Sequence, residues 1–168
     1  MRRERSKTHP AANQPRSDRT HQSDEKDPYA TRGKLPDPTV CPSCGAMYRK
    51  GRWIWGDAPA DAQRTACPAC RRIADGYPAG IVRFTGPFVQ KHADEIRGLV
   101  RHIEEREKKE HALKRIIAVE SEADALVVTT TDEHLARGIG EAVHHAYQGE
   151  IDYRFSEAEN VLRVDWKR

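Results

Sequence analysis

Four cysteines are the feature that most constrains this chain of 168 residues. They form two short hooks, Cys41-Pro42-Ser43-Cys44 and Cys67-Pro68-Ala69-Cys70, separated by residues 45–66. A Cys-x2-Cys hook turns the backbone so that two sulfurs face one ion, and a second hook completes a tetrahedral set of four thiolates. Zinc suits both this geometry and these soft ligands. The spacing therefore predicts a zinc ribbon with one structural zinc ion, whose ligands are Cys41, Cys44, Cys67 and Cys70.

Two other uses of the thiols compete with zinc. A Cys-Pro-x-Cys hook also resembles a thioredoxin-type redox pair, so redox chemistry or redox-triggered zinc release stays open as an alternative. Two disulfides would suit a secreted protein, but Met1-Arg2-Arg3-Glu4-Arg5 leads into polar residues with no apolar export region. No apolar run approaches transmembrane length. We expect a cytoplasmic protein without membrane contact.

Residues 1–39 differ from the rest of the chain in composition. They contain nine Lys/Arg and six Asp/Glu, with many Pro, Ser, Thr, Gln and Asn and few apolar side chains. Such a segment cannot bury enough surface to offset the entropy lost on ordering it. We expect a disordered tail over 1–39, a zinc ribbon over 40–85 and an α+β domain over 86–168.

The net charge of +3 conceals an asymmetry along the chain. Residues 40–85 contain seven Lys/Arg against three Asp/Glu, whereas residues 86–168 contain thirteen against seventeen. This pattern indicates a basic contact module beside an acidic scaffold. A Zn(Cys)4 centre carries about −2, so the ribbon keeps only about +2 overall. Its cations are therefore expected to act as a local patch.

Apolar periodicity predicts that the α+β domain follows the order αββαββ, with helices covering an antiparallel sheet. Gly86-Pro87 opens a long helix that is expected to join the ribbon to this domain. Its charged end, Glu104 to Glu110, projects into solvent or bridges to the next element. A second helix begins at a Thr130 or Asp132 cap and ends near Gly149. The strand candidates cover 114–119, 125–130, 151–155 and 161–166.

Aromatic and cationic residues alternate between the hooks, in Tyr48-Arg49-Lys50-Gly51-Arg52-Trp53-Ile54-Trp55. Aromatic faces stack on unpaired bases and cations hold phosphates, so this composition suits RNA. The alternative, given equal weight, is that Trp53 and Trp55 lie on one strand face and pack against the ribbon or the α+β domain, with the cations outside. The candidate RNA-binding residues are Arg49, Lys50, Arg52, Trp53, Trp55, Arg71 and Arg72, of which the last two follow the second hook and are expected to project beside the zinc.

No pattern of catalytic residues accompanies the hooks. The chain has no Gly-x-Ser-x-Gly motif, no Walker-type lysine loop and no thiol outside the hooks. Glu104 to Glu110 is a charge run typical of an exposed helix. We therefore expect a protein that is not an enzyme. An enzyme with a substrate pocket around His134 is the hypothesis that we rank lowest.

Several of these segments together resemble a known family. They are Cys41-Pro42-x-Cys44-Gly45, Gly51-Arg52-Trp53-x-Trp55, Cys67-Pro68-x-Cys70-Arg71-Arg72, Tyr77-Pro78-Ala79-Gly80 and Thr129-Thr130-Thr131-Asp132-x-His134-Leu135-Ala136-Arg137. The chain, over roughly residues 40–166, resembles small bacterial zinc-ribbon proteins related to the N-terminal zinc-binding region of the archaeal and eukaryotic large-ribosomal-subunit export adaptor. In that family the ribbon and the adjoining α+β part dock on the large ribosomal subunit. The chain has no leucine-rich export signal, so nuclear export is not implied.

The sequence thus predicts a non-enzymatic, zinc-stabilised protein that binds the ribosome, with the large subunit as the suspected site, or another structured RNA. Ribosome biogenesis, translation and ribosome dormancy are the processes this would serve. The alternative is a protein-interaction module in which the zinc is structural and the acidic α+β face holds a protein partner.

Overall fold

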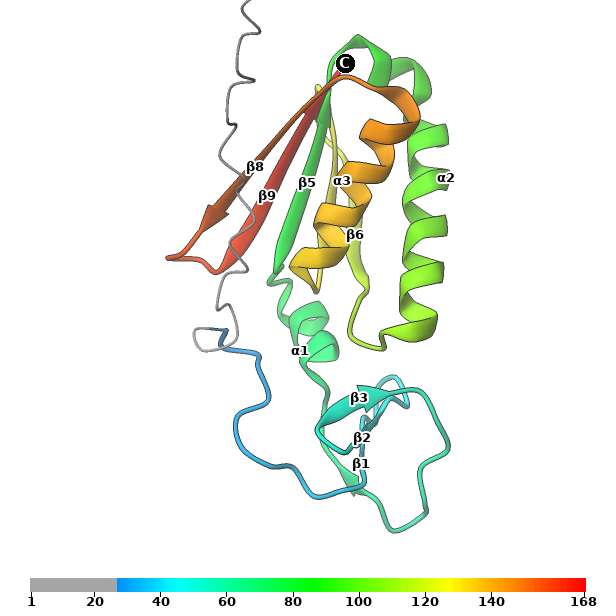
Figure 1. Cartoon of the computed structure of the whole chain (residues 1–168), viewed down its shortest axis with the longest axis vertical. Helices are drawn as coiled ribbons and strands as arrows, with labels where there is room; N and C mark the ends of the chain where they lie inside the picture. Colours follow the sequence, from blue (N-terminus) through cyan, green and yellow to red (C-terminus); the bar gives the residue numbers. More distant parts are fainter. Residues whose placement is uncertain (1–26) are drawn as a thin grey trace, which may run out of the picture.

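The computed structural model describes residues 27–168 and contains two sheets, one above the other in Figure 1. The small sheet has strand order β3-β2-β1-β4 and the large one β6-β7-β5-β9-β8. The elements of the lower part are β1 (Thr39–Val40), β2 (Met47–Arg49), β3 (Arg52–Ile54), β4 (Gln63–Arg64) and α1 (Pro68–Asp75). Those of the upper part are β5 (Gly80–Thr85), α2 (Pro87–Glu110), β6 (Ile116–Ser121), β7 (Ala125–Thr130), α3 (Glu133–Tyr147), β8 (Glu150–Ser156) and β9 (Val161–Lys167). The predicted α+β class is confirmed.

The position of β5 differs from the sequence prediction. Residues 80–85 were expected to end the ribbon, but β5 is the middle strand of the large sheet. It pairs antiparallel with β7 and parallel with β9, so the sheet is mixed and not purely antiparallel. The physical reason is burial, because Val82 and Phe84 point into the main core and are fully buried there. The ribbon therefore ends before β5, and the larger unit has the order βαββαββ. The expected connection through the long helix is wrong, because α2 follows β5 and so begins inside the larger unit.

Helices α2 and α3 lie side by side over the same face of the large sheet (Figure 1). Beneath them lies a continuous core that includes Trp166, Phe84, Ile96, Leu126 and Ile139. Helix α2 begins at a proline, as predicted, and is 24 residues long. Even so, among residues 27–168 no helix combines the length and the apolar character that crossing a bilayer requires.

The start of α3 settles which residue caps it. The Asp132 carboxylate accepts a hydrogen bond from the backbone N–H of Leu135 at 2.8 Å, so Asp132 is the N-cap. The Thr130 hydroxyl instead donates to the Asp132 carbonyl at 2.7 Å. The predicted hairpin of β8 and β9 is confirmed, while β6 begins two residues later than expected.

The segment before β1 makes specific contacts, although the whole of 1–39 was expected to be disordered. Asp27 forms a 2.6 Å ion pair with Arg72 of α1, and the Tyr29 hydroxyl donates to Asp75 at 2.7 Å. Thr39 lies in β1 and is fully buried. Residues 27–39 thus contact the folded body through charged and aromatic side chains despite their polar composition. The rest of the predicted tail, 1–26, lies outside the described residues.

Candidate metal centre

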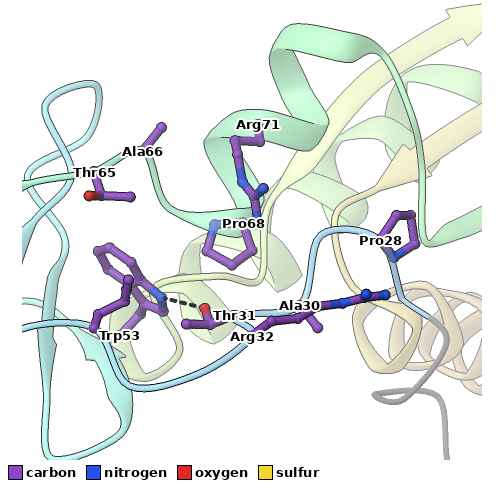
Figure 2. Close-up of a pocket in the computed structure, with 10 residues that line it drawn as sticks. Pro28, Ala30, Thr31, Arg32, Trp53, Thr65, Ala66, Pro68 and Arg71 are labelled. Carbon is purple, nitrogen blue, oxygen red and sulfur yellow. Dashed lines mark hydrogen bonds between the residues drawn. The ribbon is translucent and has the colours of Figure 1, made fainter.

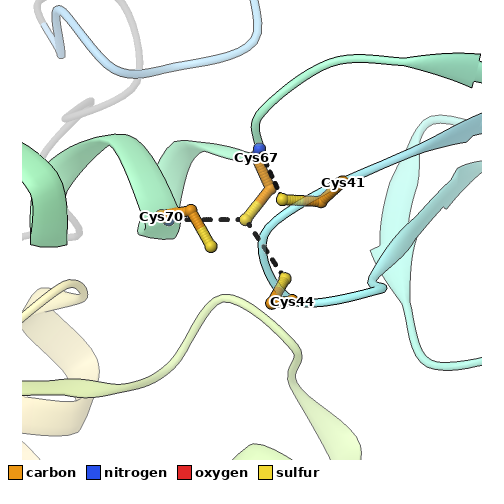
Figure 3. A group of neighbouring side chains, drawn as sticks. All are labelled: Cys41, Cys44, Cys67 and Cys70. Atoms are coloured by element: carbon orange, nitrogen blue, oxygen red, sulfur yellow. Dashed lines mark hydrogen bonds between the residues drawn. The ribbon is translucent and has the colours of Figure 1, made fainter.

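The four cysteine sulfurs converge on one point (Figure 3), and all four lie within 4.8 Å of one another. The sulfurs of Cys44 and Cys67 are 3.8 Å apart. A tetrahedron with Zn–S distances of about 2.3 Å has edges of about 3.8 Å, whereas a disulfide needs about 2.05 Å. All four cysteines are free thiols. The cluster therefore fits a single tetrahedral metal ion, and the predicted grouping of the two hooks is confirmed.

The first hook is shaped by the turn that follows β1. The Gly45 N–H donates to the Cys41 carbonyl at 2.9 Å, and the Cys41 N–H donates to the Ala46 carbonyl at 2.8 Å. Gly45 has a φ of +78°, a left-handed conformation that glycine adopts without strain. This closed turn brings Cys44 back beside Cys41.

The second hook is the beginning of α1. Cys67 is the N-cap of this helix, and its sulfur accepts a hydrogen bond from the Cys70 N–H at 3.4 Å. Pro68 occupies the first helical position, where its missing N–H costs nothing. The Cys67 N–H in turn donates to the Cys41 sulfur at 3.3 Å, which links the two hooks. Backbone amides thus point at sulfur, an arrangement that favours thiolates.

The surroundings affect the acidity of the thiols in opposite directions. Burial opposes ionisation of Cys41, but hydrogen bonds from the Cys67, Cys44 and Ser43 backbone outweigh it and lower the pKa of Cys41 to about 6. Burial raises the pKa of Cys67 and of Cys70. Cys41 is therefore ionised more readily than Cys67 and Cys70, and a bound cation favours the thiolate form of these two.

A residue that the sequence analysis did not single out lies against the cluster. The guanidinium of Arg115 donates to the sulfurs of Cys67 at 3.2 Å, Cys44 at 3.4 Å and Cys70 at 3.4 Å. Burial alone would lower the pKa of Arg115. Its hydrogen bond to Cys70 and the charges of the nearby thiolates outweigh burial and raise the pKa overall, so the side chain is charged. Arg115 was expected inside a strand, but it lies in the connection between α2 and β6. Nothing in the sequence around Arg115, a basic residue before an apolar run, predicts its contact with the cysteine sulfurs.

The ligand set defines what the centre can do chemically. Four thiolates fill the coordination sphere of a tetrahedral ion, which leaves no position for substrate or water. Within residues 27–168, these cysteines form the one group of three or more His, Cys, Asp or Glu side chains arranged to hold a metal. The centre is suited to stabilising the fold and unsuited to hydrolysis.

The cations and the tryptophans between the hooks differ in exposure. Arg49, Lys50 and Arg52 are exposed, and Lys50 and Gly51 form the left-handed turn between β2 and β3. Trp53 is only 8 % exposed, and its indole N–H lies 3.4 Å from the Thr31 hydroxyl. The half-buried Trp55 donates from Nε1 to the Lys108 carbonyl of α2 at 2.6 Å. Trp53 thus packs inside the ribbon, Trp55 is half-buried against α2, and the cations are on the surface.

Of the two arginines after the second hook, one is not available to a ligand. Arg72 is 2 % exposed; it pairs with Asp27 and packs over the Tyr29 ring at 4.6 Å. The expectation that Arg72 projects beside the metal is therefore wrong, because its side chain is buried and its charge is paired with Asp27. Arg71 is exposed at the surface and donates to the Tyr29 carbonyl at 2.6 Å.

Two hollows accompany these residues. One, of about 330 Å³, lies between the 28–35 segment and the ribbon, with Trp53, Arg32 and Arg71 among its lining residues (Figure 2). No carboxylate lines it. The other, of about 110 Å³, is lined by His134 and Glu133 among others, and is smaller than the roughly 300–1,000 Å³ of typical ligand pockets.

Comparison of the chain with protein-family models, with curated proteins and with solved structures gives no match in any of the three. The resemblance drawn from the sequence motifs therefore stays an expectation. The geometry of the cysteines and the distribution of charge are the observations from which a function can be argued.

Proposed function

We propose that this protein is a non-enzymatic, zinc-stabilised module that binds structured RNA, with the ribosome, and its large subunit in particular, as the suspected target. The observation that carries the proposal is the turn between β2 and β3, where Arg49, Lys50 and Arg52 are exposed together. The four-thiolate centre supports zinc as the ion, because its geometry and soft ligands match the preference of zinc.

The position of the tryptophans changes how RNA would be held. Trp53 is buried, and Trp55 is half-buried with its indole N–H bound to α2, so little indole surface is left for base stacking. Contact is therefore expected through phosphates, which makes binding strongly dependent on salt and weakly dependent on sequence. Arg32 and Arg71 line the acid-free cavity beside Trp53 and provide a second, separate pair of cations for phosphate contact.

The test is co-sedimentation with ribosomal particles as salt is raised. Changing Arg49, Lys50 and Arg52 together to Ala should weaken binding and reduce the slope of log K against log salt by about 2–3, because each phosphate contact contributes about 0.7–0.9. A matched control changes Lys91, Arg101 and Lys109 to Ala, which removes the same charge from the exposed surface of α2. Equal losses in both variants, or none in the first, would count against the proposed surface.

The second candidate is a protein-interaction module, favoured by the face of the large sheet opposite α2 and α3. Ion pairs lie on this side, among them Arg83 of β5 with Glu122 in the turn after β6, and Arg154 of β8 with Asp165 of β9. Nuclease treatment before a pull-down separates the candidates. A protein partner retained without RNA favours the second function, and a partner lost with the RNA favours the first.

A further inference from the structure

Arg115 connects the metal centre to a different part of the molecule. The ligand hooks follow β1 and begin α1, whereas Arg115 lies 45 residues after the last ligand in the chain. Its side chain is 7 % exposed and contacts the sulfurs of Cys44, Cys67 and Cys70. The connection between α2 and β6 thus places a cation against the cysteine sulfurs of the ribbon.

The backbone around Arg115 is fixed by the large sheet. The Arg115 N–H donates to the Thr131 hydroxyl at 2.9 Å, and the Thr131 N–H donates to the Arg115 carbonyl at 2.9 Å. The Thr131 hydroxyl also donates to the Leu113 carbonyl at 2.6 Å. Within the side chain, Nε donates to the Ala112 carbonyl at 3.1 Å. These bonds position the guanidinium from the residue that follows β7.

Charge explains why the cation is needed at this place. Four thiolates and one divalent ion leave about −2 in a largely buried centre, and a buried charge without a partner is costly. The planar guanidinium brings one positive charge and donors in a fixed fork, which a lysine does not reproduce. Replacing a residue that hydrogen-bonds to metal ligands in this way typically lowers the metal affinity about 10–100-fold.

We propose that Arg115 is an electrostatic latch, through which the metal-loaded cysteine cluster holds the ribbon against the large domain. Metal binding and docking of the ribbon are then coupled, and each strengthens the other by the same factor. The metal would in this way set the orientation of the Arg49–Arg52 turn relative to the large sheet. The inference rests on the proposed metal and is independent of RNA binding.

The first test measures metal release from the full chain to a chromophoric chelator. Arg115→Met keeps the aliphatic stem but removes the charge and the donors, so metal affinity should fall about 10–100-fold. Arg115→Lys restores the charge without the fork and should lie between Met and the parent. Arg163→Met, which removes an exposed arginine paired with Glu159, is the control and should release metal like the parent. Release from Arg115→Met at the parental rate overturns the latch.

The second test uses the unaltered protein and does not depend on any variant folding. Amide hydrogen exchange is followed over residues 111–116 and 131 before and after chelation. Exchange there should accelerate when the metal is removed, although no ligand lies in these segments, while β5 and β9 in the large sheet stay protected. Metal-loaded Arg115→Met should already show the accelerated exchange. Unchanged exchange on chelation of the parent protein overturns the proposal.

Elemental analysis separates failure of the latch from failure of the metal site. Gently prepared protein without stoichiometric metal contradicts the metal-binding function itself. Stoichiometric metal, with exchange and release insensitive to Arg115, contradicts only the latch.

Discussion

The two sheets of this protein are stabilised by different means. Strands of the large sheet are six or seven residues long and bury a continuous apolar core under two helices. Strands of the ribbon are two or three residues long, and the small cluster beneath them includes Cys41 and Cys67 themselves. Units this small bury too little surface to fold alone and depend on a metal or a neighbour. The ribbon, which carries the cationic turn, therefore depends for its folding on the metal and on contact with the large domain, whereas the large sheet does not.

The largest expected effect comes from removing a ligand. Cys67 is fully buried and also caps α1, so Cys67→Ser should abolish tight metal binding and unfold the ribbon, given that structural zinc sites contribute about 10–16 kcal/mol of binding in zinc-finger peptides. Metal content and amide NMR dispersion measure this. The large sheet should keep its dispersion. Ser43→Ala, an exposed change in the first hook, is the control and should retain metal.

Acid should open the ribbon before the large sheet. Backbone hydrogen bonds outweigh burial and lower the pKa of Cys41 to about 6, below the roughly 8.5 of a free thiol. Without metal, the Cys41 thiolate stabilises the folded ribbon fully above about pH 8.5, and this contribution is lost as the pH falls through 6, whereas the raised pKa values of Cys67 and Cys70 act in the opposite direction. Protons also compete with the metal for all four thiolates. Metal retention and amide exchange between pH 8 and 5 measure the effect, and simultaneous opening of both sheets would contradict it.

A cavity in the main core should affect only the large sheet. Leu126 of β7 is 1 % exposed, so Leu126→Ala should lower the free energy of unfolding of this part by about 2–5 kcal/mol. Urea denaturation followed by circular dichroism measures the loss, with metal content unchanged. Ile54→Ala, at an exposed site in β3, is the matched control and should cost less than about 0.5 kcal/mol.

The smallest expected effect concerns the contact between the two parts. Trp55→Phe removes the indole N–H that donates to the Lys108 carbonyl but keeps an aromatic ring. The loss should be about 0.5–1.5 kcal/mol, the net value of one hydrogen bond. It should appear as faster amide exchange around β3 and the end of α2. An effect spread over the whole large sheet would show that the two parts unfold together.

The sequence predicted those features that depend on neighbouring residues. The cysteine hooks, the proline start of α2, the cap region of α3 and the hairpin of β8 and β9 are all local patterns, and the structure has them. Residues 80–85 were assigned to the ribbon but form β5 of the large sheet, because a short apolar strand gives no indication of which sheet it joins. The same limit applies to Arg72, whose pairing with Asp27 depends on a polar segment that composition alone marks as disordered.

Spacing along the chain alone determined that two pairs of thiols would meet and that helices and strands would alternate after them. Only the tertiary structure decided that Arg115 faces three of those sulfurs, that the tryptophans turn inward and that β5 lies in the middle of the large sheet. The physical reason is that local geometry follows from adjacent residues, whereas burial and charge pairing depend on which distant segments are packed together.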